Sequence, residues 1–269
     1  MTAGKCLPLM LRFSIPILLG NLFQQMYTVV DGIVVGRSVS TQALAAVGVG
    51  FPITYMLTSI FLGIGLGASV LVSQHFGKRD MDQVRATVST MNTFLLIIAV
   101  PITLLGIFTI DPFLHLLNTD AEIFADARLY MVVYYVGMLP QFGYNVNANI
   151  LQGIGDSRTP LLILIASSAL HVLLAVLLVS VLPFGVAGVA WSTVLSQAFS
   201  WGLSILLIRR KYPEIGGAFR QFRVHPASFW QSLKVGVPIC LQNALFSLGM
   251  MVMQPLINGY ITIMPSENS

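Results

Sequence analysis

The stretch from Thr159 to Ile208, TPLLILIASSALHVLLAVLLVSVLPFGVAGVAWSTVLSQAFSWGLSILLI, contains no aspartate, glutamate, lysine or arginine. A helix needs about 20 mostly apolar residues to cross ~30 Å of hydrocarbon, so this stretch is long enough for two membrane spans. Pro183, Phe184 and Gly185 supply the helix breakers that mark a turn between them. The stretch therefore predicts a pair of membrane helices.

The composition of the whole chain is that of an integral membrane protein. Of its 269 residues, 56% are hydrophobic and 9% are charged, whereas soluble domains carry roughly 25% charged residues. The mean hydropathy is +0.83. These values exclude a soluble enzyme and a disordered protein. Two cysteines, Cys6 and Cys240, are too few for a disulfide framework or a structural zinc site.

Other uncharged stretches extend the prediction to seven helices in an all-α, polytopic membrane bundle. The helices are expected near residues 11–36, 46–74, 86–109, 127–151, 160–182, 186–208 and 231–260. With the N-terminus in the cytoplasm, every lysine and arginine except Arg37 and Arg128 falls on the inner side. We therefore expect a multi-pass protein of the inner (plasma) membrane with the lipid bilayer as its partner. The basic excess is explained by topology, so nucleic-acid binding is not expected.

The seventh expected helix repeats the first at an offset of 222 residues. The matching residues Leu11, Pro16, Ile17, Leu19 and Asn21 recur as Leu233, Pro238, Ile239, Leu241 and Asn243. Six spans separate the copies, so both enter the membrane in the same direction, as in transporters built from two parallel lobes. This predicts a six-helix lobe over residues 1–210, a cytoplasmic linker over 211–230, and the first helix of a truncated second lobe over 231–269. The missing part of that second lobe would be a further partner.

Polar residues form one face of the first expected helix. These residues are Asn21, Gln24, Gln25, Thr28 and Asp31. A carboxylate inside a membrane span costs ~2.5–3.5 kcal/mol on insertion scales, so Asp31 is a candidate carrier of H⁺ or Na⁺. The alternative is a hydrated, structural carboxylate near the outer interface. We expect the amides to line a cavity, and Pro16 to bend the helix, either as a static kink or as a moving hinge.

Three later helices add polar candidates. Gln141, Asn145 and Asn149 share one face of the fourth helix, and Gln197 lies in the sixth. We expect these four residues to line the same cavity, although hydrogen bonds between helices would also explain them. In the fifth helix, His171 is either a packing histidine or a titrating group that faces Asp31. No catalytic, nucleotide-binding or metal-binding motif is found, so we expect no enzyme, no cofactor and no metal site. Transport would then be driven by an ion gradient or by the substrate alone.

Six segments of the chain resemble the multidrug and toxic compound extrusion (MATE) transporters. They are GNLFQQMYTVVDGIVVGR ending at Arg37, ALAAVG over 43–48, GIGLGASVLVSQHFG over 63–77, GIGDSRTP over 153–160, GVAGVA over 185–190 and LQN over 241–243. The resemblance implies two six-helix lobes around a central cavity, and export of cationic or amphipathic small molecules in exchange for H⁺ or Na⁺. It also implies that Asp31 is the coupling acid, that Pro16 lies in a helix that bends, and that Thr193 belongs to the same ion network.

The chain departs from the family pattern in the fifth helix. His171 and Ala175 stand where the family usually has an asparagine and an aspartate. Without that carboxylate a sodium site lacks a ligand, which leaves a proton relay between Asp31 and His171 open. Two other readings remain: a lipid-linked oligosaccharide flippase, which would need basic residues in its cavity, and a non-transporting membrane fragment.

Overall fold

The structure is a computed structural model that describes the backbone of residues 6–38, 48, 58, 62–116, 119–182 and 184–263. Several side chains within the first and last helices lie outside the described part, among them Thr28 and Asp31. The described part is mainly helical and contains no strand, which confirms the predicted all-α fold. The helices are α1 (Cys6–Ser38), a helical stretch over residues 62–77, α3 (Met81–Leu116), α4 (Ala121–Val136), α5 (Met138–Gly153), α6 (Arg158–Ala175), the π-helical η1 (Val176–Val181), α7 (Gly185–Lys211), α8 (Pro213–Gly216), the 3₁₀ turn η2 (Gly217–Arg220) and α9 (Pro226–Ile263).

Four of the described helical segments are long and apolar enough to cross a membrane. They are Leu7–Met26, Met81–His115, Arg158–Val181 and Gly185–Lys211. The single helix expected over residues 127–151 is instead two helices, α4 and α5, which meet at Gly137. Pro140 explains the break, because it has no N–H to donate to the carbonyl of Val136 one turn earlier.

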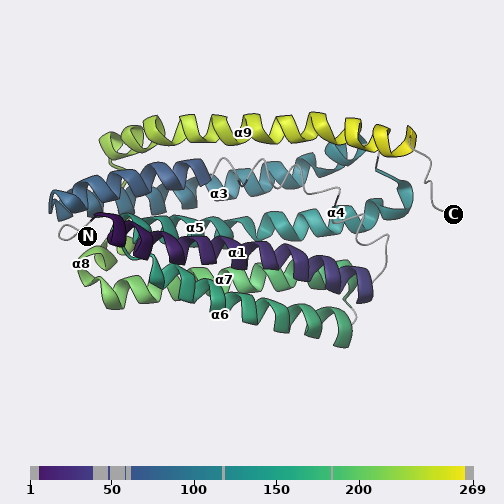
Figure 1. Cartoon of the computed structure of the whole chain (residues 1–269), viewed down its shortest axis with the longest axis horizontal. Coiled ribbons are helices and arrows are strands. Elements are labelled where there is room, and N and C mark those ends of the chain that lie inside the picture. The colour runs from purple at the N-terminus through teal and green to yellow at the C-terminus, as the bar shows by residue number, and fades with distance from the viewer. Residues whose placement is uncertain are drawn as a thin grey trace.

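The helices run side by side along one long axis (Figure 1). One end of the bundle collects the starts of α1, α3, α6 and α9, the ends of α5 and α7, and α8 (Figure 1). Most basic residues of the described part lie at or near this end. They include Arg85, Arg158, Arg209, Arg210, Lys211, Arg220 and Arg223. We call it the basic end.

A row of four buried serines, which we call the serine ladder, lies where α7 packs inside the bundle. Ser192, Ser196, Ser200 and Ser204 recur every four residues and are all buried. Small side chains at this spacing allow a neighbouring helix to approach closely. The ladder also makes a polar contact, because Asn147 Nδ2 of α5 donates a 2.8 Å hydrogen bond to Ser204 Oγ.

The expected linker is packed against the lobe. Ile215 and Ala218 are 1% exposed and join a core cluster that contains Val84, Val88 and Ile208. Three polar contacts hold its backbone: Arg85 Nε donates to the Glu214 carbonyl at 2.8 Å, Ser89 Oγ to the Arg223 carbonyl at 3.1 Å, and the His225 N–H to Thr90 Oγ1 at 3.0 Å. The segment that leads into α9 therefore forms part of the lobe's own core.

The helical stretch over residues 62–77 lies backbone to backbone against the start of α9. A Cβ atom added at Gly67 would collide with the Ser232 carbonyl oxygen, and one added at Gly63 would lie 2.9 Å from the Cys240 backbone nitrogen. A Cβ at Gly236 would lie 2.7 Å from the Gly63 carbonyl oxygen. Glycine on both sides is what lets these two helices approach so closely.

Candidate functional site

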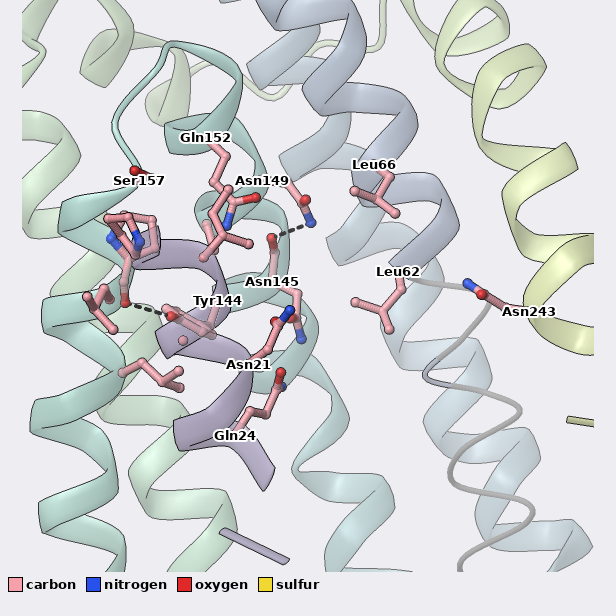
Figure 2. A pocket seen from close by; sticks show the side chains of 17 residues that line it. Asn21, Gln24, Leu62, Leu66, Tyr144, Asn145, Asn149, Gln152, Ser157 and Asn243 are labelled. Carbon is pink, nitrogen blue, oxygen red and sulfur yellow. Dashed lines mark hydrogen bonds between the residues drawn. The ribbon is translucent and has the colours of Figure 1, made fainter. Parts of the chain in front are cut away.

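A cavity of about 320 Å³ lies between α1, the stretch 62–77, α5, α6 and α9. Six of its 17 lining residues carry side-chain amides: Asn21, Gln24, Asn145, Asn149, Gln152 and Asn243 (Figure 2). We call it the amide cavity. The other lining residues are Pro16, Ile17, Gly20, Leu62, Leu66, Tyr144, Ala148, Ser157, Pro160, Leu161 and Leu164. Its lining is therefore polar without a charged side chain.

The amides of α5 are held in place by their own helix. Asn145 Nδ2 donates to the Gln141 carbonyl and Asn149 Nδ2 to the Asn145 carbonyl, each at 2.9 Å. A primary amide has two N–H bonds and one carbonyl oxygen, so each keeps one N–H and its Oδ1 after this bond. Gly65 makes room for the second amide, since a Cβ there would lie 2.7 Å from Asn149 Nδ2.

The helices α1 and α9 also contribute amides to the lining. Asn21 and Gln24 are three residues apart on α1 and lie on the same side as Asn145 (Figure 2). Asn243 reaches the cavity from α9 beyond Leu62 (Figure 2). The cavity thus joins the first helix of the lobe to the helix that follows the linker.

Two of the lining residues brace the wall near the basic end. Tyr144 is 5% exposed, and its hydroxyl donates a 3.0 Å hydrogen bond to the Pro160 carbonyl. Pro160 is buried in the first turn of α6, where a missing N–H costs no helical hydrogen bond. This contact ties α5 to the start of α6.

A second cavity, of about 250 Å³, lies between α1 and α6. It is lined by Phe23, Met26, Val30, Ile165, Ser168, Ala169, His171 and Val172, and we call it the histidine cavity. The His171 side chain is 1% exposed. Val30, the residue before Asp31, faces the same cavity, while the Asp31 side chain itself lies outside the described residues. The two cavities follow one another along α1.

The remaining residues expected at the site have other positions. Gln25 is exposed on α1, and the Thr28 side chain lies outside the described part. Gln141, Thr193 and Gln197 line neither cavity. Thr193 Oγ1 donates to the Val189 carbonyl of its own helix at 3.3 Å. The structure therefore brings together Pro16, Asn21, Gln24, Asn145 and Asn149 around one cavity, and puts His171 in the next.

Asp156 centres a polar cluster at the basic end. Its Oδ2 accepts hydrogen bonds from Lys211 Nζ at 2.7 Å, from Thr159 Oγ1 at 2.6 Å and from the Tyr212 hydroxyl at 2.9 Å. Burial alone would raise the pKa of Asp156, but these hydrogen bonds outweigh it and lower the pKa to about 2. Burial and the hydrogen bond to Asp156 raise the pKa of Tyr212. The cluster therefore holds an ionised carboxylate and a protonated phenol at neutral pH.

The sequence pattern missed several of these residues. Asn243 belongs to the internal repeat and to the LQN segment that resembles MATE transporters, and it was not expected in the cavity, although the repeat aligns it with the cavity residue Asn21. Tyr144 and Ser157 gave no signal of their own. Among the described residues, no group of three or more histidine, cysteine, aspartate or glutamate side chains could hold a metal ion.

The family model for MatE matches residues 16–177. This range includes the residues of α1, α5 and α6 that line the two cavities. The chain belongs to the MatE family. This MatE chain is 31% identical over 265 residues to "Probable multidrug resistance protein YpnP" of Bacillus subtilis (strain 168), covering 96% of this chain and 58% of that protein. It is 26% identical over 261 residues to a protein named "FAD transporter" of Shewanella oneidensis, with 95% and 55% covered.

Solved MATE structures share the fold. The outward-facing conformation of a multidrug resistance MATE family transporter of the MOP superfamily aligns with a TM-score of 0.83 and 28% identity, over 90% of this MatE chain and 54% of that chain. The chain spans about half the length of the curated relatives and solved structures that it matches. Proteins of the MATE family are membrane transporters.

Proposed function

We propose that this chain forms one lobe of a secondary active efflux transporter for amphipathic small molecules. The amide cavity is the observation that carries the proposal. At about 320 Å³ it has the volume of a small-molecule site, and it combines apolar walls with a few convergent polar groups. It lies between α1 and α9, the two helices that the internal repeat relates. A relative named as a multidrug resistance protein, YpnP, covers 96% of the chain and supports the same class of cargo.

The coupling ion, H⁺ or Na⁺, binds at Asp31 in this proposal, with His171 and Thr193 as further members of the ion site. Support comes from α1, which lines both cavities. Its residues in the amide cavity are Pro16, Ile17, Gly20, Asn21 and Gln24, and those in the histidine cavity are Phe23, Met26 and Val30. A single helix thus contacts both ligands. A change in α1 on ion binding, bending at Pro16, would lower affinity for the substrate, and linkage makes that effect reciprocal.

The proposed orientation puts the N-terminus and the basic end in the cytoplasm of the inner (plasma) membrane. The gathering of lysine and arginine at one end of the bundle supports it (Figure 1). Substrate would enter the amide cavity from that side.

The test is the Asp31→Asn variant in efflux-deficient bacterial cells. We expect cells that express the wild-type chain to extrude at least one of two test compounds, uncharged lumichrome or cationic proflavine, against its gradient and to lose this activity when a protonophore is added. Asp31→Asn should reach the membrane in equal amounts, measured by immunoblot of membrane fractions, and should extrude neither compound. Normal efflux by this variant would remove Asp31 from the mechanism. No efflux by the wild type would favour a non-transporting membrane fragment.

The amide cavity does not support a function as a lipid-linked oligosaccharide flippase. A buried pyrophosphate group is paired with lysine or arginine side chains, and none of the 17 described lining residues is a lysine or an arginine.

A further inference from the structure

Among the described residues, those that line the amide cavity include no carboxylate to pair with a positively charged ligand. An organic cation inside a protein is stabilised most strongly by a carboxylate, or by an aromatic face within about 6 Å. The aromatic residue of the described lining, Tyr144, is buried with its hydroxyl bonded to the Pro160 carbonyl. The segments 39–61 and 244–263 contain no aspartate or glutamate, so they add no carboxylate.

Two arginines lie next to the described lining residues of the cavity. Arg12 precedes the lining residue Pro16 by about one helical turn, ~6 Å along α1. Arg158 follows the lining residue Ser157 directly, and both arginines are exposed. The neighbouring acid, Asp156, is already paired with Lys211 at 2.7 Å. A cation approaching from the basic end therefore meets repulsion and finds no counter-ion inside.

The amides suit a different ligand. A primary amide presents a donor and an acceptor side by side in one plane, which matches the alternating N–H and C=O edge of an imide or lactam ring. Hydrogen bonds within α5 fix the planes of Asn145 and Asn149, so little rotamer entropy is lost when a ligand binds. Leu62, Leu66 and Leu164 supply apolar surface for the faces of such a ring.

We propose that the amide cavity selects uncharged, planar heteroaromatic ligands with an imide-type edge and discriminates against permanent cations. This inference rests on the proposed function, because it names the substrate class of that same site. It narrows the class expected from the family resemblance, which included cationic compounds.

Two fluorescent tricyclic probes of similar size test the inference on the full chain in phosphatidylcholine nanodiscs. Lumichrome is uncharged and carries an imide edge, whereas proflavine is a cation without one. We expect lumichrome to bind at least about tenfold more tightly at pH 7, because its imide edge can both donate to and accept from one side-chain amide, whereas the N–H groups of proflavine can only donate. Equal or tighter binding of proflavine, or binding of neither probe, overturns the inference.

Two variants that add a carboxylate to the cavity lining test whether the selectivity between the two probes arises in the amide cavity. Asn145→Asp and Gln24→Glu each add a carboxylate to the lining, and each should shift the preference toward proflavine by about tenfold. If size-exclusion chromatography shows that Asn145→Asp does not fold, Gln24→Glu still tests the inference, because Gln24 is exposed on α1. The matched control, Gln231→Glu, adds the same charge at an exposed position of α9 outside the cavity and should leave the ratio unchanged. Unaltered ratios in both cavity variants would contradict the inference.

The efflux assay separates the two proposals. Selective lumichrome binding without efflux would refute transport by this chain and leave the inference standing. Efflux of both probes, with tighter binding of proflavine, would refute the inference and leave transport standing.

Discussion

The ammonium group of Lys211 lies 2.7 Å from a carboxylate oxygen of Asp156, across a sequence separation of 55 residues. This ion pair joins the loop between α5 and α6 to the last residue of α7. Gly155, with a positive φ of 89°, turns the chain so that the carboxylate of Asp156 points back toward α7 and Tyr212. The pair therefore fastens three helices together at the basic end, beside the amide cavity residue Ser157.

Asp156→Asn should lower stability at neutral pH by about 1 kcal/mol, a figure that allows for solvent screening at the half-exposed Lys211. Because folding depresses the pKa of Asp156 to about 2, its stabilisation is complete above pH ~4 and is lost as the pH falls toward 2. Thermal unfolding in detergent checks this: the wild type should exceed the variant at pH 7, and the difference should shrink by pH 3. Asp82→Asn, which removes the exposed ion pair with Arg85, is the control and should change little at either pH.

Ser204→Ala should lower the free energy of unfolding by about 1–3 kcal/mol, because Asn147 is fully buried and would lose the acceptor of its 2.8 Å hydrogen bond. Denaturant or thermal unfolding of the purified chain measures the loss. Ser73→Ala removes an exposed hydroxyl whose bond stays within its own helix, so that variant should behave like the wild type. Equal stability of Ser204→Ala and Ser73→Ala would show that the buried hydrogen bond contributes nothing.

Gly65→Ala should weaken lumichrome binding several-fold, by roughly 1 kcal/mol, while the chain stays folded. The added methyl group would lie 2.7 Å from Asn149 Nδ2, so the amide must move from its position in the cavity wall. Fluorescence titration gives the affinity. Gly77→Ala places the same methyl group at the end of the same helical stretch with no atom within 4 Å, and its affinity should be unchanged.

His171→Asn should reduce proton-driven efflux by at least about tenfold if His171 relays protons to Asp31. Lumichrome binding should not change, since His171 lines the histidine cavity and not the amide cavity. Efflux into buffers of different pH, compared with binding to the same variant, makes the distinction. His115→Asn changes an exposed histidine near the end of α3 and should keep full efflux; an equally active His171→Asn would assign His171 to packing.

Periodicity in the sequence predicted the parts of the site that belong to one helix. The spacing of Asn145 and Asn149 put both on one face of α5, and that of Asn21 and Gln24 did the same for α1, because helical geometry alone fixes which side chains share a face. The serines from Ser192 to Ser204 also recur every four residues, and that spacing indicates close packing of α7 against a neighbouring helix.

Relations between helices could not be predicted in this way. Nothing in the sequence near Asp156 indicates that its partners are Lys211 and Tyr212, since their meeting depends on how α5, α6 and α7 are arranged. The break at Gly137 depends on a single missing hydrogen bond at Pro140, which hydropathy does not register. The roles expected of Asp31 and Thr193 in ion coupling stay predictions.

The close contact of Gly63 with the α9 backbone at Gly236 and Cys240 holds the first part of α9 against the helical stretch 62–77. Asn243 lies about one turn beyond this contact. Bending of α9 just beyond the contact would therefore move Asn243 relative to the other walls of the amide cavity.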